Sequence, residues 1–144
     1  MADEKQEETK VKKKHKLTAK ITETTNPNDP ESDKAVDITF YDGDNKIGEA
    51  SVSGIDIKNG FLYNVEVFKK YRGQGYGNDI MDYVLSHYSI NELTVEPDNV
   101  IAINLYKKYG FKPYKKFKEN GKIMLDMRIN KVAESTIFDG VIFM

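Results

Sequence analysis

The sequence contains no cysteine, and histidine occurs only at His15 and His87. The absence of cysteine excludes a disulfide, a thiolate zinc site and a cysteine nucleophile. Two histidines leave little for a histidine-rich metal site or for a Ser-His-Asp triad, so we expect no metal. A chain without cysteine also fits a reducing compartment, and we expect a cytoplasmic protein.

Long apolar runs are missing as well. No run approaches the ~20 residues that cross a bilayer, and the charged start is no signal peptide, so no membrane partner is expected. The formal net charge of −1 gives no general attraction to nucleic acid. The 144 residues, of which 39% are apolar, suit a single domain around one core.

The two ends of the chain differ in composition from the middle. Residues 1–16 are almost wholly polar, first acidic and then rich in lysine. They favour a flexible charged arm, and the alternative is a lysine cluster that docks on an acidic partner. Residues 131–144 form an apolar extension that ends on Ile142, Phe143 and Met144. Such an end is typical of a strand on its own body, or of a contact in a homo-oligomer or larger assembly.

Residues 17–130 carry the periodic patterns of one folded domain. Alternating apolar residues predict strands, and apolar residues at helical spacing predict the first helix. Pro97-Asp98-Asn99 marks the start of a second helix, and Gly110 marks its end. The predicted strands are 17–24, 35–41, 46–57, 61–67, 92–95, 111–117 and 123–129, and the predicted helices are 75–88 and 97–109. This order predicts an α+β fold with a mixed central sheet, parallel where a helix crosses over between strands.

Three glycines, Gly73, Gly75 and Gly77, occupy alternate positions between a predicted strand and the helix after it. A helix start has unpaired N–H groups and partial positive charge, and glycine permits positive φ and close backbone approach. The pattern therefore predicts a cradle for a pyrophosphate, and the alternative is only a tight turn. Asn78 follows Gly77, so the loop is not a Walker loop, and the spacing is not that of a dinucleotide fingerprint.

The segment from Phe61 to Val67, with Arg72-Gly73-Gln74-Gly75-Tyr76-Gly77 after it, resembles the central segment of the GNAT family of N-acetyltransferases. A second family segment follows in the right order. It consists of Val95-Glu96-Pro97-Asp98-Asn99, then Ala102, Leu105-Tyr106 and Tyr109-Gly110-Phe111. The resemblance covers residues 36 to 129 and implies an acyl-CoA N-acyltransferase fold.

The resemblance also implies acetyl-CoA as cosubstrate and an amine acceptor, either a small molecule or a protein amine. In this family the glycine loop binds the pyrophosphate, and the strand before it splays so that its backbone pairs with the pantetheine arm. Asn99 would offer an amide to the same arm. The implied cofactor-binding residues are Val65, Val67, Arg72, Gly73, Gln74, Gly75, Tyr76, Gly77, Asn99 and Tyr106.

Tyr106 and Glu66 are the candidate catalytic residues. Tyr106 lies two helical turns after Asn99, so the two residues share a face. A tyrosine with a pKa near 10 stays protonated at neutral pH, and the resemblance implies that Tyr106 is the general acid for the leaving thiolate. Strand geometry points Glu66 away from Val65 and Val67, and makes it a candidate general base through water. The alternatives are a packed aromatic residue and an ordinary surface carboxylate.

One departure from the family concerns residues 25–34. Family members usually carry a pair of helices between the first two strands, whereas this connection has about ten residues, too few for two helices. The acceptor side is therefore shortened. The leading hypothesis is an acetyl-CoA-dependent N-acetyltransferase, and the alternative is a non-catalytic structural or interaction protein that retains the fold.

Overall fold

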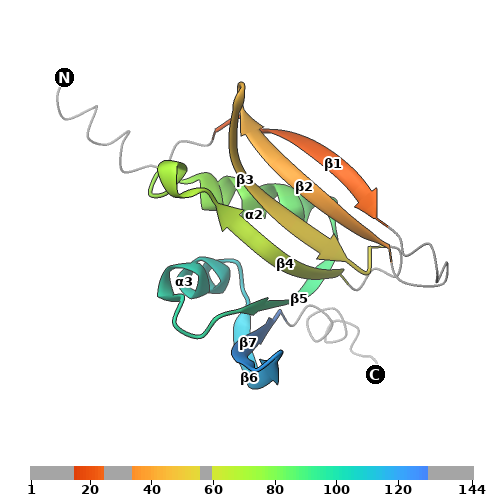
Figure 1. Cartoon of the computed structure of the whole chain (residues 1–144), viewed down its shortest axis with the longest axis vertical. Helices are drawn as coiled ribbons and strands as arrows, with labels where there is room; N and C mark the ends of the chain where they lie inside the picture. The colour runs from red at the N-terminus through yellow and green to blue at the C-terminus, as the bar shows by residue number, and fades with distance from the viewer. Residues whose placement is uncertain (1–14, 25–33, 56–59, 130–144) are drawn as a thin grey trace, which may run out of the picture.

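The computed structural model describes residues 15–24, 34–55 and 60–129. Within them one sheet has the strand order β1-β2-β3-β4-β5-β7-β6 (Figure 1). The elements are β1 (Thr18–Thr24), β2 (Ala35–Asp42), β3 (Asn45–Ser53), β4 (Gly60–Val67), the 3-10 turn η1 (Lys69–Tyr71), α2 (Tyr76–His87), β5 (Ile90–Val95), α3 (Val100–Lys108), β6 (Lys112–Glu119) and β7 (Lys122–Arg128). None of the helices described is long and apolar enough to cross a membrane.

The predicted α+β architecture with a mixed sheet is confirmed. β4 and β5 pair in parallel, connected through α2, and the other neighbouring strands pair in antiparallel fashion. The strand predicted over 46–57 ends earlier, because Gly54 takes a left-handed conformation (φ 69°) and its N–H binds the backbone oxygen of Lys34 (3.0 Å). Most of the predicted arm and all of the 131–144 extension lie outside the described residues.

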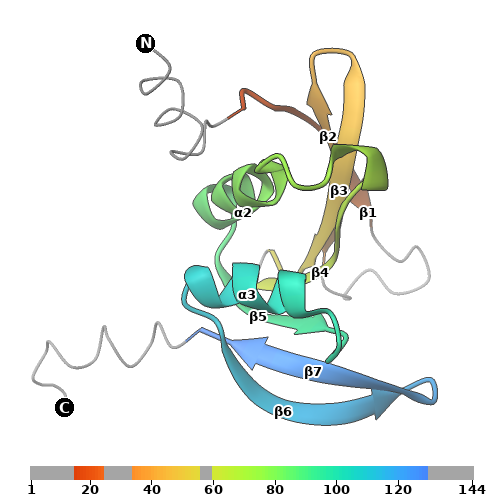
Figure 2. The same cartoon turned by 90° about the vertical axis from the view of Figure 1, so that its left-hand side faces the viewer.

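Both helices pack on the same face of the sheet. The helices bury one residue on each of four successive strands, β3, β4, β5 and β7. These residues lie side by side and are Val52, Leu62, Leu93 and Met127. Each such side chain contributes about 1.5–3 kcal/mol through burial. Figure 2 shows α2 beside β2, β3 and β4, with α3 over β5 and β7. The opposite face carries no helix among the described residues, and we call it the open face.

The pairing of β4 with β5 stops early. The two strands are in register from Gly60 with Ile90 to Leu62 with Leu93, and no later pair is found in the described residues. Asn64 has a positive φ of 55°, and the register of β4 against β3 shifts at the same place. Such a bulge bends its strand. The later half of β4 therefore parts from β5 and leaves a split between the two strands.

Gly48 lets β3 hold the bent part of β4. It lies opposite Val67, and a Cβ there would overlap the backbone oxygen of Glu66 and lie 3.1 Å from Cδ1 of Ile80. We expect Gly48→Ala to lower the free energy of unfolding by about 2–3 kcal/mol, measured by urea denaturation.

Gly43→Ala is the matched control for this substitution. Gly43 (φ 64°) lies in the turn between β2 and β3, and apart from its chain neighbours no described residue has an atom within 4 Å of a Cβ added there. Alanine at this position meets only the cost of the left-handed conformation, about 1 kcal/mol. Equal losses in the two variants would show that the close approach to β4 is not what requires Gly48.

Candidate functional site

The candidate site lies where the split opens, at the carboxyl ends of β4 and β5. Parallel strands bring these ends to one edge of a sheet, where α/β proteins commonly bind ligands. β4 leads through the glycine loop into α2, and β5 leads into α3. A Cβ on Gly77 would lie 3.2 Å from Cδ2 of Leu105, so the first turn of α2 touches α3. Both helix starts therefore border the split.

The glycine loop takes the conformations that glycine makes accessible. Gly73 and Gly75 have φ of 79° and 90°. Gly75 is the N-cap residue of α2, and no side chain among the described residues caps this helix. The first N–H groups of α2 are therefore available to a ligand, and the helix dipole favours an anion there.

The valines and Glu66 on the bent part of β4 face opposite ways, as the strand pattern predicts. Val65 and Val67 pack against the hydrophobic core, so only their backbone is offered to the split. The side chain of Glu66 is 49% exposed, and its Oε2 lies 3.7 Å from Nη2 of Arg72. Nε of Arg72 also donates to the backbone oxygen of Val67 (2.7 Å). Arg72 is thereby held at the end of β4, beside the loop.

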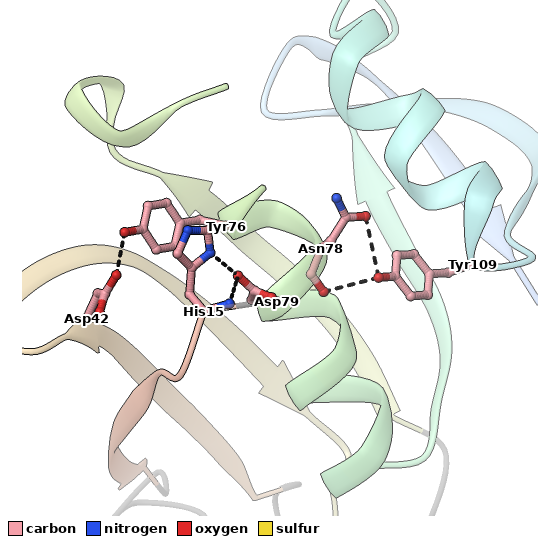
Figure 3. Close-up of polar contacts among 6 residues, drawn as sticks. All are labelled: His15, Asp42, Tyr76, Asn78, Asp79 and Tyr109. Carbon is pink, nitrogen blue, oxygen red and sulfur yellow. Dashed lines mark hydrogen bonds and ion pairs between the residues drawn. The ribbon is translucent and has the colours of Figure 1, made fainter. Parts of the chain in front are cut away.

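The start of α2 is fixed from beneath by side chains (Figure 3). The Tyr76 hydroxyl donates to Oδ2 of Asp42 (2.5 Å), and this hydrogen bond, together with burial, raises the pKa of Tyr76 to about 12. The His15 ring stacks on Tyr76 at 4.0 Å, and its Nδ1 lies 2.6 Å from Oδ2 of Asp79. The side chain of Tyr76 is thus used in packing, and its backbone N–H is the part that faces the cradle.

A second group of contacts joins α2 to the end of α3. The Tyr109 hydroxyl donates to Oδ1 of Asp82 (2.9 Å). It also lies 3.1 Å from the backbone oxygen of Asn78 (Figure 3). Burial, with the Asp82 carboxylate, raises the pKa of Tyr109. Nζ of Lys108 donates to Oδ1 of Asn78 (3.0 Å). Sequence reasoning missed this clamp, because its residues lie about 30 positions apart and no local motif joins them.

Asn99 and Tyr106 lie on α3. Oδ1 of Asn99 accepts a hydrogen bond from the N–H of Ala102 (3.2 Å), so Asn99 is the N-cap of α3 and its NH₂ remains as a donor. Tyr106 is 4% exposed, and burial raises its pKa to about 12. Unlike Tyr76 and Tyr109, Tyr106 owes none of this shift to a carboxylate. Tyr106 is therefore a buried phenol on α3 that keeps its proton at neutral pH.

These residues suit a ligand that is anionic at one end and extended at the other. The uncapped start of α2 can bind an anion, and the unpaired edge of β4 can hydrogen-bond an extended chain as a neighbouring strand would. The predicted cofactor-binding residues lie on three segments that border the split, namely the end of β4, the glycine loop with the start of α2, and α3 with its N-cap. The side chain of Tyr76 is buried, and those of Val65 and Val67 are partly buried against the core.

Comparisons with known proteins agree with this geometry. The model of the acetyltransferase (GNAT) family matches residues 4–111. A search of curated proteins finds no match. Among solved structures, the chain is similar to an IAA acetyltransferase from Bacillus cereus (14% identity, TM-score 0.57, covering 78% of this chain and 99% of that one).

Two further structures are also similar. One is a GNAT family acetyltransferase from Elizabethkingia anophelis with acetyl-CoA bound (18% identity, TM-score 0.53, 77% of this chain and 97% of that one). The other is an acetyltransferase from Bacillus subtilis in complex with CoA (16% identity, TM-score 0.55, 79% and 98%). At these identities the likeness shows the fold. Because the family model spans most of the sequence and the fold agrees, this chain belongs to the acetyltransferase (GNAT) family.

Proposed function

We propose that the protein is an acetyl-CoA-dependent N-acetyltransferase in which a primary amine attacks the thioester directly. The observation that carries this proposal is the split between β4 and β5, which ends at the uncapped start of α2. Membership of the family supports acyl transfer in general. The similar structures with acetyl-CoA and CoA bound support the choice of cosubstrate.

The residues at the split fit acetyl-CoA. The pyrophosphate would meet the first N–H groups of α2, and Arg72 would stand beside it. Apart from its two chain neighbours, no described residue has an atom within 4 Å of a Cβ added to Gly73, so the loop backbone is open to close approach. The edge of β4 beyond Leu62 would pair with the amides of the pantetheine arm. Acetyl-CoA supplies the thioester that the amine attacks.

The chain's own groups would then act on the reacting atoms. Backbone N–H groups of Val65–Val67 polarise the thioester carbonyl. As the N–C bond forms and the C–S bond breaks, Glu66 receives the proton of the amine through water. A phenol with a pKa of about 12 binds its proton more tightly than a thiol with a pKa near 8.5. Tyr106 would therefore stabilise the leaving thiolate as a hydrogen-bond donor, since complete proton transfer to it is uphill.

The alternative of a non-catalytic interaction protein differs in one measurable respect, because it requires no acetyl-CoA binding. Its motivating features, the charged arm and the extension over 131–144, lie mainly outside the described residues. Assembly through that extension and a cytoplasmic location stay predictions.

Gly73→Glu tests the pyrophosphate cradle. A carboxylate in this loop would repel the pyrophosphate, and we expect affinity for acetyl-CoA to fall by about tenfold or more, measured by calorimetry. Gly121→Glu is the matched control, because Gly121 (φ 78°) and Gly73 (φ 79°) share the same conformation and open surroundings. A wild-type chain that folds but binds no acetyl-CoA would overturn the proposed function and favour the alternative.

Tyr106→Phe tests the donor to the thiolate. We expect kcat to fall by about tenfold or more while the Kd for acetyl-CoA changes little, because the hydrogen bond forms only as sulfur becomes negative. The measurement is steady-state release of CoA with a primary amine. Tyr88→Phe, at the far end of α2, is the control and should leave kcat unchanged. An unchanged kcat in Tyr106→Phe would show that Tyr106 is not the donor to the leaving thiolate.

The pKa of Tyr106 also predicts how stability depends on pH. Burial raises this pKa from 10.0 to about 12, so between these values the folded chain retains a proton that the unfolded chain has released. The free energy of unfolding should fall as pH rises through this window, by up to about 1.4 kcal/mol per pH unit from this group. We expect the wild type to lose about 2–3 kcal/mol more than Tyr106→Phe between pH 10 and 12, measured by urea denaturation. Equal losses of unfolding free energy in both proteins between pH 10 and 12 would contradict the raised pKa of Tyr106.

A further inference from the structure

The open face of the sheet is hollowed next to the split. A hollow of about 800 Å³ is lined by side chains of β3 to β7, among them Phe61, Tyr63, Glu92, Thr94, Asp126 and Arg128. Phe61, Glu92 and Arg128 lie side by side on β4, β5 and β7. Each is the chain neighbour of a residue that the helices cover, namely Leu62, Leu93 or Met127. Because successive side chains of a strand alternate between faces, these three point to the open face.

This hollow reaches the split from the face opposite the helices. Tyr63 and Asn64 line it from the bent part of β4, and Thr94 lines it from β5 just beyond the last pair of the two strands. Glu66, exposed on the same side of β4, stands further along that strand. An acceptor in the hollow would therefore approach the thioester from the face opposite the glycine loop.

Asp126 and Glu92 make the hollow acidic. Asp126 is 2% exposed; its Oδ2 accepts from Nη2 of Arg128 (3.1 Å), and its buried Oδ1 has no hydrogen-bond partner within the part of the chain that the structure describes. Oε2 of Glu92 lies 3.5 Å from the same nitrogen. Two carboxylates thus share one guanidinium, and a buried oxygen lacks a donor, which is unfavourable.

Two cations line the same hollow, Arg128 of β7 and Lys115 of β6. The Arg128 guanidinium lies 3.8 Å from the centre of the Tyr114 ring and pairs with both carboxylates, and Nζ of Lys115 lies 5.9 Å from the centre of the same ring. Burial, and after it the neighbouring Asp126, raise the pKa of Glu92. The lining of the hollow holds three carboxylates, of Glu92, Glu119 and Asp126, against these two cations. The stacked rings of Phe61 and Tyr63, 5.8 Å apart, add aromatic surface that favours a cation.

The carboxylates are too far from the split to hold the reacting nitrogen. Asp126 lies directly opposite Thr94 on the next strand, and strands are about 4.8 Å apart. In an acceptor whose reacting nitrogen lies in the split, the group that contacts Asp126 would thus be roughly 5–10 Å from that nitrogen. This distance corresponds to about four to seven bonds. We propose that the hollow is the acceptor site and selects linear diamines, whose second ammonium group binds Asp126 and Glu92.

This inference rests on the proposed acetyl transfer. In that reaction the neutral amine forms the N–C bond, the C–S bond breaks, sulfur keeps the electron pair, and the surplus proton of the amine leaves through water to Glu66. The second ammonium group stays charged and is not consumed. Asp126 and Glu92 are therefore residues that select and position the acceptor.

The test compares putrescine, a linear diamine of four carbons, with butylamine, a monoamine of the same chain length, on the full chain. We expect kcat/KM for putrescine to exceed that for butylamine by about tenfold. Asp126→Asn and Glu92→Gln should each abolish this preference by raising KM for putrescine, while the Kd for acetyl-CoA stays the same. Glu23→Gln, on the distant edge strand β1, is the control and should keep the preference.

The outcomes separate this inference from the proposed function. If the chain acetylates both amines equally, or Glu92→Gln and a folded Asp126→Asn keep the preference, diamine selection is wrong and acetyl transfer stands. If acetyl-CoA does not bind, the proposed function fails. Calorimetry with putrescine alone then decides: binding that is lost in Glu92→Gln supports the cation site, and no binding to the wild type overturns it. Thermal unfolding of each variant identifies those that fail to fold.

Discussion

The early end of pairing between β4 and β5 is the constraint on which the rest of the structure depends. Asn64, in a left-handed conformation, bends β4, and Gly48 allows β3 to follow the bend closely. The edge of β4 that faces β5 is then left without the partner that its backbone groups require. A sheet that opens in this way holds a ready place for an extended ligand, since strand pairing is the interaction that the split has removed.

The split removes hydrogen bonds that would hold strands β1–β4 at a fixed angle to strands β5–β7. Contacts between the two helices take the place of these hydrogen bonds. Tyr109 binds Asp82 across α3 and α2, and Gly77 lets Leu105 approach the first turn of α2. The start of α2 is fixed independently through Tyr76 and Asp42. The N–H groups that would meet the pyrophosphate are therefore positioned before any ligand binds, which lowers the entropy that binding must overcome.

Much of this arrangement could be predicted from the sequence, because local chemistry determines it. Helical periodicity located α2, and the signals at Pro97 and Gly110 located α3. The positive φ of Gly73 and Gly75 agrees with the conformation that the glycines predicted. Two features could not be predicted, the bend at Asn64 and the position of β7 between β5 and β6, because both depend on pairing between strands that are distant in the sequence. Asp126 alternates with apolar Leu125 and Met127 and so indicates a solvent-facing residue, yet the neighbouring strands bury it. Alternation predicts which face a residue occupies, and not what covers that face.

The two faces of the split would recognise ligands by different means. On the helix-covered face the ligand would meet backbone N–H groups and glycines, which many sequences can supply. On the open face it would meet side chains, chiefly those of Glu92 and Asp126, which a single substitution can replace. Among the described residues no helix lies on this face. The choice of acceptor would therefore depend on residues that the fold does not require, and cofactor binding on geometry that it does.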